Sequence, residues 1–401
     1  MTPPARLPET PAVTHWPRVL LLWVCGILAG MQFAKVSVAF QALQGLYGVT
    51  PAQMGWVLST VGMVGLLLGV TMGLFAPAIG YRRLLLGGLA LGAALSALQA
   101  LLPAYPLLLA TRVLEGASHL AIVVAAPTLI AANCAPAHRS IAMGLWSTFV
   151  GVAFAITAAV GGWVMQRVGV DGLLLAHAVG MAVMVAITGR ILGPDPGPAA
   201  RPLWPEPGLL ARQHVAVYTD FDTALPGLGF FCYTVMAVAL LTFVPAWAGP
   251  DRAWVAVVLP LMVIAGNFGA GWLVQRWVPP LQLTRGAFAA VGVSALWMGW
   301  SHAGGHSIAP AALALLFSAG LSGGAIFALI PYLCRDSRRQ ARAMGAVAQM
   351  GNLGSSSGPP LLAALMVPLG MSGLVLPVLV FALLGAGLAT WAALHHAGRR
   401  R

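Results

Sequence analysis

The chain has 401 residues, of which 59% are hydrophobic and 7% are charged, and its 21 Lys and Arg against 9 Asp and Glu give a formal net charge of +12. Soluble globular proteins are about 25% charged, so a soluble chain of this length would lack the polar surface that it needs. The composition therefore excludes a soluble enzyme, a disordered scaffold and a secreted disulfide-rich domain. It indicates a protein that crosses a lipid bilayer many times.

The ends and the cysteines of the chain add little chemistry. Residues 1–17 are rich in proline and predict a cytoplasmic tail, not a cleaved signal peptide. The cysteines are isolated in the sequence, so we expect no disulfide framework, no metal site and no cofactor. They are Cys25, Cys134, Cys232 and Cys334.

Apolar stretches long enough to cross a bilayer recur along the chain. A spanning helix needs about 20 apolar residues, and Gly and Pro are tolerated inside such helices. We therefore predict an all-α membrane protein with twelve spans. In chain order these are residues 19–41, 52–75, 84–102, 107–132, 141–165, 173–192, 225–247, 254–274, 286–302, 308–333, 344–369 and 374–394.

The arginines predict the orientation of these spans. With a cytoplasmic N-terminus, seventeen arginines fall in the inside segments, whereas the outside loops hold only Arg167 and Arg252. An excess of basic residues marks the cytoplasmic side, so both termini are predicted to be cytoplasmic, in a bacterial inner membrane. The net positive charge is then a topology signal, and we expect no nucleic-acid partner.

A proline-rich polar stretch divides the twelve spans into six and six. It predicts a cytoplasmic linker over residues 193–223. The other predicted parts are a bundle over residues 18–192, a bundle over 224–395 and a basic cytoplasmic tail over 396–401.

The two halves repeat each other with an offset of about 200 residues. The tripeptide Ala-Met-Gly occurs at 142–144 and again at 343–345, and Pro127 in span four corresponds to Pro331 in span ten. Duplicated halves related by an axis along the membrane normal are a transporter architecture, with the binding site between the halves.

With twelve spans and two repeated halves, the sequence resembles the major facilitator superfamily over essentially its whole length. The segment between spans two and three matches a motif of that family at Gly73, Gly80, Arg82 and Arg83, but Pro77 replaces the family's Asp. The resemblance implies two six-helix bundles and transport by alternating access. It gives the four matching residues a gating or structural role and puts the usual gating latch in doubt.

Two further motifs refine the resemblance. The residues from Arg112 to Gly116 are similar to a helix-four element of the family, and Gly354, Gly358 and Pro359 in span eleven are further structural candidates. Drug–proton antiporters carry a Gly-Pro element in helix five, where this chain has Thr157-Ala158. This departure weakens an antiporter interpretation.

The chain contains a single lysine, Lys35, inside span one. A P-loop needs a lysine that reaches the phosphates of a nucleotide, so the chain is not its own P-loop ATPase, and an ion gradient is the expected energy source. Ionisable groups inside a bilayer are functional candidates by default. In this chain they are Lys35, Arg112 and Glu115.

These three charges are predicted to lie in one layer of the membrane. At about 1.5 Å per residue, Arg112 lies about 8 Å and Glu115 about 12 Å from the outer surface, and Lys35 lies about 9 Å from it. Helices one and four line the central cavity in the resembled family, so we expect a cluster with a net charge of +1. It is either a binding site for an anionic or zwitterionic solute, to which Gln32 also contributes, or a structural salt bridge from which Lys35 snorkels outward.

The remaining polar residues of the spans are weaker candidates. A glutamate between two cations should stay ionised, so His119 joins Glu115 as a proton-coupling candidate, since histidine titrates nearest neutrality. His177 is a second titratable neighbour. In the C-terminal half, the polar side chains bind substrate or act as interhelical glue; the substrate-binding candidates there are Tyr233, Gln349 and Asn352.

The predicted function is secondary active transport of a small organic anion or zwitterion, coupled to protons, by a monomer that is not an enzyme. Its partners are the solute, protons and the lipid bilayer. Three alternatives stay open. They are efflux of lipophilic compounds, copper-related uptake through His177, Met181 and Met184, and a sensor that does not transport.

Overall fold

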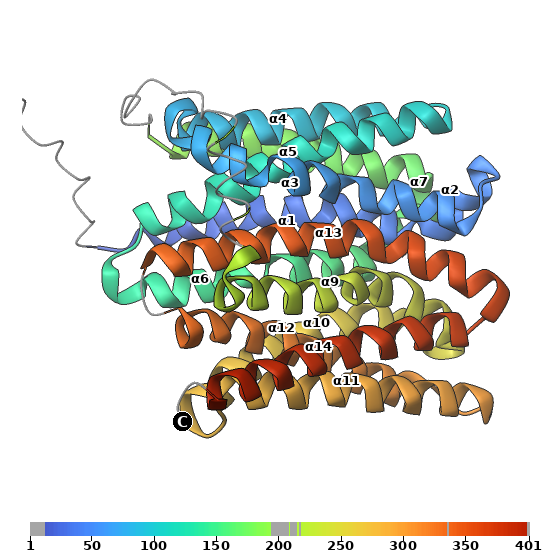
Figure 1. The fold of residues 1–401 in the computed structure, drawn as a ribbon. Coiled ribbons are helices and arrows are strands. Elements are labelled where there is room, and N and C mark those ends of the chain that lie inside the picture. The colour runs from blue at the N-terminus through green and yellow to red at the C-terminus, as the bar shows by residue number, and fades with distance from the viewer. Residues whose placement is uncertain (1–12, 194–207, 209–214, 216–217, 335–336, 399–401) are drawn as a thin grey trace, which may run out of the picture.

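The computed structural model describes residues 13–193, 208, 215, 218–334 and 337–398, and within them every regular element is a helix. Two short 3₁₀ turns, Pro136–His138 and Gly249–Asp251, accompany the α-helices. The α-helices, labelled in Figure 1, are α1 (Trp16–Val38), α2 (Phe40–Tyr47), α3 (Pro51–Ile79), α4 (Tyr81–Ala100), α5 (Tyr105–Ala132), α6 (Arg139–Ser147), α7 (Phe149–Ile191), α9 (Phe221–Trp247), α10 (Arg252–Arg276), α11 (Pro280–Ala303), α12 (Ala309–Leu333), α13 (Ser337–Leu369) and α14 (Ser372–Gly398).

The twelve predicted spans fall on helices, but span one runs from α1 through Ala39 into α2, and span five is divided between α6 and α7 at Thr148. Spans five and six continue into each other through α7, where Gly169 has a φ of 77° and turns the chain back. Glycine adopts this left-handed conformation without a steric cost. Within the described residues, nine helices are long and apolar enough to cross a membrane; α11 and α13 are not among them, and α13 carries a run of polar residues at 349–357.

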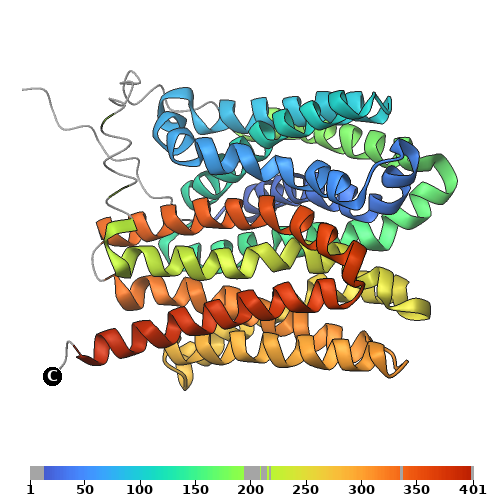
Figure 2. The same cartoon turned by 45° about the vertical axis from the view of Figure 1, so that its right-hand side comes forward.

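The helices form two groups that lie side by side with their axes roughly parallel (Figure 1). Helices α1 to α7 make one group and α9 to α14 the other, and a second direction of view shows the same division (Figure 2). The groups meet mainly where α3 packs on α13 and where α7 packs on α10. The start of α1 and the end of α14 lie at the same end of the molecule.

A polar side-chain contact closes each half at this end of the molecule. In the first half, Thr14 Oγ1 and His138 Nδ1 are 2.9 Å apart. In the second half, Arg339, about 200 residues after His138, donates to Asp220 through Nε at 2.9 Å. Asp220 is half-buried and forms an ion pair with Arg339, which a search of single spans could not reveal.

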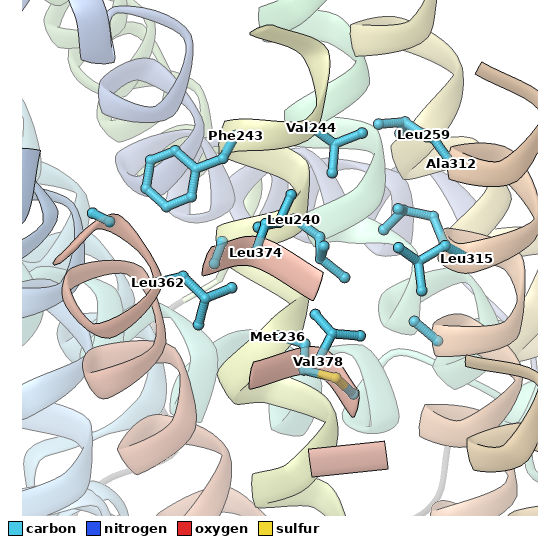
Figure 3. Packing of buried hydrophobic residues seen from close by; sticks show 14 of the residues in the cluster. Met236, Leu240, Phe243, Val244, Leu259, Ala312, Leu315, Leu362, Leu374 and Val378 are labelled. Carbon is cyan, nitrogen blue, oxygen red and sulfur yellow. The ribbon is translucent and has the colours of Figure 1, made fainter. Parts of the chain in front are cut away.

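Apolar side chains fill the second half (Figure 3). The side chains of α9 occupy the centre, and they meet residues of α10, α12, α13 and α14 in one buried cluster. Figure 3 labels Met236, Leu240, Phe243, Val244, Leu259, Ala312, Leu315, Leu362, Leu374 and Val378. The cluster fixes α9 against its neighbours and extends into the first half, where Phe40 of α2 packs edge-on against Phe243.

Glycines let several of these helices approach backbone to backbone. A Cβ added at Gly358 of α13 would overlap the carbonyl oxygen of Val235 in α9, and one added at Gly266 of α10 would overlap that of Phe317 in α12. Small residues at membrane helix contacts permit this close approach. Gly266 therefore has a packing role, whereas a Cβ at Gly271 of the same helix would meet open space.

We expect Gly358→Ala to lower the thermal unfolding temperature of the purified protein clearly. The extra methyl must push apart two packed backbones, and overpacking of this kind costs about 1–3 kcal/mol. The matched control is Gly345→Ala in the same helix, where an added Cβ has no neighbour within 4 Å. Equal unfolding temperatures for the two variants would contradict this account of the α9–α13 contact.

Candidate functional site

The three charged residues predicted inside the membrane meet in the first half of the molecule. Lys35 Nζ of α1 lies 2.7 Å from Glu115 Oε1 of α5, and Arg112 of α5 forms a hydrogen-bonded ion pair with Glu115 Oε2. None of the three side chains is more than 1% exposed. The predicted clustering is confirmed, and outward snorkelling of Lys35 is wrong because its ammonium group points into the bundle.

Two polar residues of α4 complete the surroundings of the lysine. Lys35 Nζ donates to Ser96 Oγ at 2.7 Å and to Gln99 Oε1 at 2.9 Å, besides Glu115. An ammonium group has three N–H donors, so these three acceptors satisfy it. Gln99 Nε2 in turn donates to Glu115 Oε2 at 2.8 Å. Ser96 and Gln99 lie one helical turn apart, and this spacing in span three was the sequence signal that could have identified them.

His177 of α7 extends the network by one more residue. Its Nε2 lies 3.0 Å from the carbonyl oxygen of Leu28, which can only accept, so we assign the ring proton to Nε2. Its Nδ1 then accepts from Ser96 Oγ at 2.8 Å. Ser96 accepts from Lys35 and donates to His177, so a continuous chain of hydrogen bonds runs from Lys35 through Ser96 to His177.

His119, the histidine predicted to couple protons, lies outside this chain of hydrogen bonds. Its Nδ1 lies 3.1 Å from the carbonyl oxygen of Ala29, and its ring packs edge-on against Phe33. Met181 and Met184, the other members of the candidate copper set, belong to the hydrophobic core of the first half. Within the described residues, no group of three His, Cys, Asp or Glu side chains could hold a metal ion.

The cluster keeps unused polar atoms despite its burial. Among the described residues, neither Arg112 Nη2 nor Gln32 Oε1 has a hydrogen-bond partner. Arg112 Nε donates to the Val57 carbonyl oxygen of α3 at 2.8 Å, and Gln32 Nε2 donates to Ser118 Oγ at 2.8 Å. Buried polar groups without partners are costly. The site therefore combines a surplus cation with a free guanidinium N–H and a free amide oxygen.

The C-terminal candidates do not join this cluster. Gln349 Oε1 accepts a hydrogen bond from Tyr218 at 2.9 Å. The ring of Tyr233 lies against Gly323 of α12, where an added Cβ would be 3.2 Å from it. Asn352 donates to the carbonyl oxygen of Ala348 in its own helix and faces Gly65 of α3, where the two halves meet. The structure thus places the binding candidates in two separate regions.

The candidate gating residues lie at distinct places. Arg82 ties α4 to the end of α7 by donating to the carbonyl oxygens of Gly189 and Leu192, at 2.7 and 3.0 Å. Gly80 joins α3 to α4 with a φ of 93°, and Arg83 is exposed at the start of α4. The surroundings of Gly73 lie outside what the structure describes.

The span-eleven candidates separate into two contacts. Gly354 and Gly358 pack on α9 inside the second half, whereas Pro359 and Pro360 form the surface that meets Gly55 of α3 in the first half. The same short segment of α13 therefore connects the core of one half to the interface with the other.

Comparison with known proteins agrees with this architecture. A family model described as Major Facilitator Superfamily matches residues 22–359. The chain is 25% identical over 397 residues to a 3-(3-hydroxy-phenyl)propionate transporter of Escherichia coli (strain K12), covering 96% of each chain. It is 26% identical over 188 residues to a tetracenomycin C resistance and export protein of Streptomyces glaucescens, covering 46% of this chain and 35% of that one.

A solved structure shares the fold. The crystal structure of a bacterial homolog of the human lysosomal transporter Spinster, in an inward-facing and occupied conformation, superimposes with a TM-score of 0.70 at 15% identity and covers 94% of this chain and 96% of that one. Helical bundles in two halves, a buried ion cluster and these matches define the class as membrane transporters. The chain belongs to the Major Facilitator Superfamily, and it transports small-molecule solutes and is not an enzyme.

Proposed function

We propose that the protein carries a small organic anion across the bacterial inner membrane together with protons, as a monomer with both termini in the cytoplasm. The observation that carries this proposal is the charge of the buried cluster. Two cations, Lys35 and Arg112, share one carboxylate, Glu115, at positions that are at most 1% exposed. A buried charge without a counter-ion is strongly unfavourable.

The surplus charge can be relieved in two ways. Either a proton leaves the cluster, or an anion approaches the unpartnered N–H of Arg112. An anion that stabilises the protonated cluster must, by linkage, be bound more tightly when the proton is present. Anion and proton are therefore expected to bind and to leave together, which is symport.

The hydrogen-bond chain gives the proton a route. Lys35 Nζ donates to Ser96 Oγ, which donates to Nδ1 of His177. A proton that leaves Lys35 can pass through the hydroxyl group to that acceptor. His177 is therefore the favoured proton carrier, and His119, which packs on Phe33, is the second choice.

The full-length relative supports an aromatic carboxylate as cargo. The compound in the name of that E. coli transporter is an aromatic ring on a short carboxylate chain, which matches an anion attracted by surplus positive charge. The relative named for export of tetracenomycin C supports efflux of a lipophilic compound as a second candidate, through less than half of the chain.

Counterflow in proteoliposomes tests the proposal. Vesicles loaded with unlabelled 3-(3-hydroxyphenyl)propionate should transiently accumulate the labelled compound, and vesicles without protein should not. A panel that includes benzoate, a neutral sugar and a lipophilic cation defines the class of cargo. Counterflow with the lipophilic cation alone would overturn the anion proposal and favour efflux.

A further inference from the structure

A cavity of about 1040 Å³ lies between the two halves, at the end of the molecule away from the chain termini. Its walls come from the ends of α1, α9 and α13, from α2, from the Gly169 turn of α7 and from the start of α10. The distribution of arginines predicts that this end faces the outside. Lys35, Arg112 and Glu115 do not line the cavity. Ser37 of α1 does, because residues two apart point to different faces of a helix.

The cavity combines an apolar wall with a polar rim. The lining includes the aromatic side chains of Phe154, Phe243 and Trp247, which we call the wall. It also includes the amide side chains of Gln41 and Gln44, which we call the rim. Pockets of this size and composition are typical of sites for small organic molecules. Within the described lining, one side chain is charged, and it is an arginine, with no carboxylate to neutralise it.

This arginine, Arg252, opens α10 and is exposed. Its Nη2 donates to Gln41 Oε1 at 3.0 Å, which joins the two halves across the cavity. A guanidinium has five N–H donors, so this bond leaves others for a ligand. Arg167, the other arginine predicted outside, stacks 4.7 Å above the ring of Trp163 and does not line the cavity.

We infer that this cavity is an outer binding site for amphipathic organic anions of the arylalkanoate class. Arg252 takes the carboxylate, for which its planar fork of donors is suited, and the wall of Phe154, Phe243 and Trp247 takes the apolar part. The inference deepens the proposed function and rests on it for the nature of the cargo. It assigns the first contact of the solute to a place separate from the buried cluster.

Protection of a cysteine at the rim tests the site by binding alone. The four native cysteines are buried, so Gln44→Cys gives the purified protein one accessible thiol for a maleimide. We expect 3-phenylpropionate to slow its labelling at a concentration about tenfold lower than its uncharged amide, 3-phenylpropanamide, because a charge-assisted hydrogen bond is lost with the amide. Arg252→Gln should remove this preference, and Arg167→Gln should keep it.

The other outcomes separate the outer site from the proposed function. The inference would be overturned if neither compound slowed the labelling, or if both slowed it equally. It would also be overturned if Arg252→Gln and Arg167→Gln reduced the preference for the anion equally. Counterflow of the anion without protection at residue 44 would leave the proposed function standing and refute only the outer site. Protection at residue 44 without counterflow would leave the outer site standing and refute the proposed transport of the anion.

Discussion

Replacing Lys35 with methionine is expected to abolish concentrative uptake of the organic anion while the protein still folds. The substitution removes the surplus cation and leaves Arg112 and Glu115 as a neutral pair one helical turn apart. Methionine fills a similar volume, and the main cost is the loss of the donors to Ser96, Gln99 and Glu115, about 1–3 kcal/mol for each acceptor left unpaired. Uptake by proteoliposomes under an imposed proton gradient, beside thermal unfolding, measures both effects.

Lys35→Arg is the matched control for this variant. It keeps the positive charge and several donors, so part of the uptake should remain, although an arginine cannot release its proton as a lysine can. Wild-type uptake by Lys35→Met would show that the cluster is a structural salt bridge and that the solute is recognised elsewhere.

Replacing Glu115 with glutamine is expected to lower the stability of the protein strongly. Glu115→Gln leaves Lys35 and Arg112 buried together without a counter-charge, and breaking a buried pair in this way costs about 3–5 kcal/mol. The unfolding temperature of this variant should fall well below that of Lys35→Met. Thermal unfolding of the purified variants in one detergent gives the comparison.

The double variant Lys35→Met with Glu115→Gln tests whether removing a cation raises the unfolding temperature once the carboxylate is gone. It holds one buried cation where Glu115→Gln holds two, so it should unfold at a higher temperature than Glu115→Gln alone. If adding Lys35→Met lowered the unfolding temperature further, the charge count could not be the dominant energy in the cluster.

The sequence alone predicted the helical fold and the clustering of the three charged residues. Apolar runs of the right length predicted the positions of the spans, and the rise per residue placed Lys35 level with Glu115, which the structure confirms at 2.7 Å. Both results depend on distances along a helix, which a sequence encodes directly. Spans five and six both lie in α7, where the backbone at Gly169 leaves the helical conformation and turns the chain back between them.

The partners of the charges were harder to predict because they depend on how the helices are rotated. His177 in span six was predicted only as a titratable neighbour, yet α7 turns its ring towards Ser96, with Nδ1 2.8 Å from the hydroxyl oxygen. Depth along a helix cannot tell whether the ring of His119 or that of His177 faces the cluster. For the same reason, Gln349 and Asn352 share a helix face in sequence but meet Tyr218 and α3, not the N-terminal charges.

The motif between spans two and three remains a prediction. Pro77 replaces the acidic residue of the resembled pattern, and its surroundings lie outside the part of the chain that the structure describes. Arg82 retains a structural task, since it holds α4 to α7 through two carbonyl oxygens. The loss of the usual latch is therefore an expectation about gating, separate from the site.

Proton movement that accompanies the anion tests the central claim most directly. Proteoliposomes with a pH-sensitive dye inside, equal pH on both sides and an inward gradient of 3-(3-hydroxyphenyl)propionate should acidify in their interior faster than vesicles without protein. The acidification should disappear in Lys35→Met. Anion flux without acidification beyond that of empty vesicles, or equal acidification in Lys35→Met, would contradict coupling through the buried cluster.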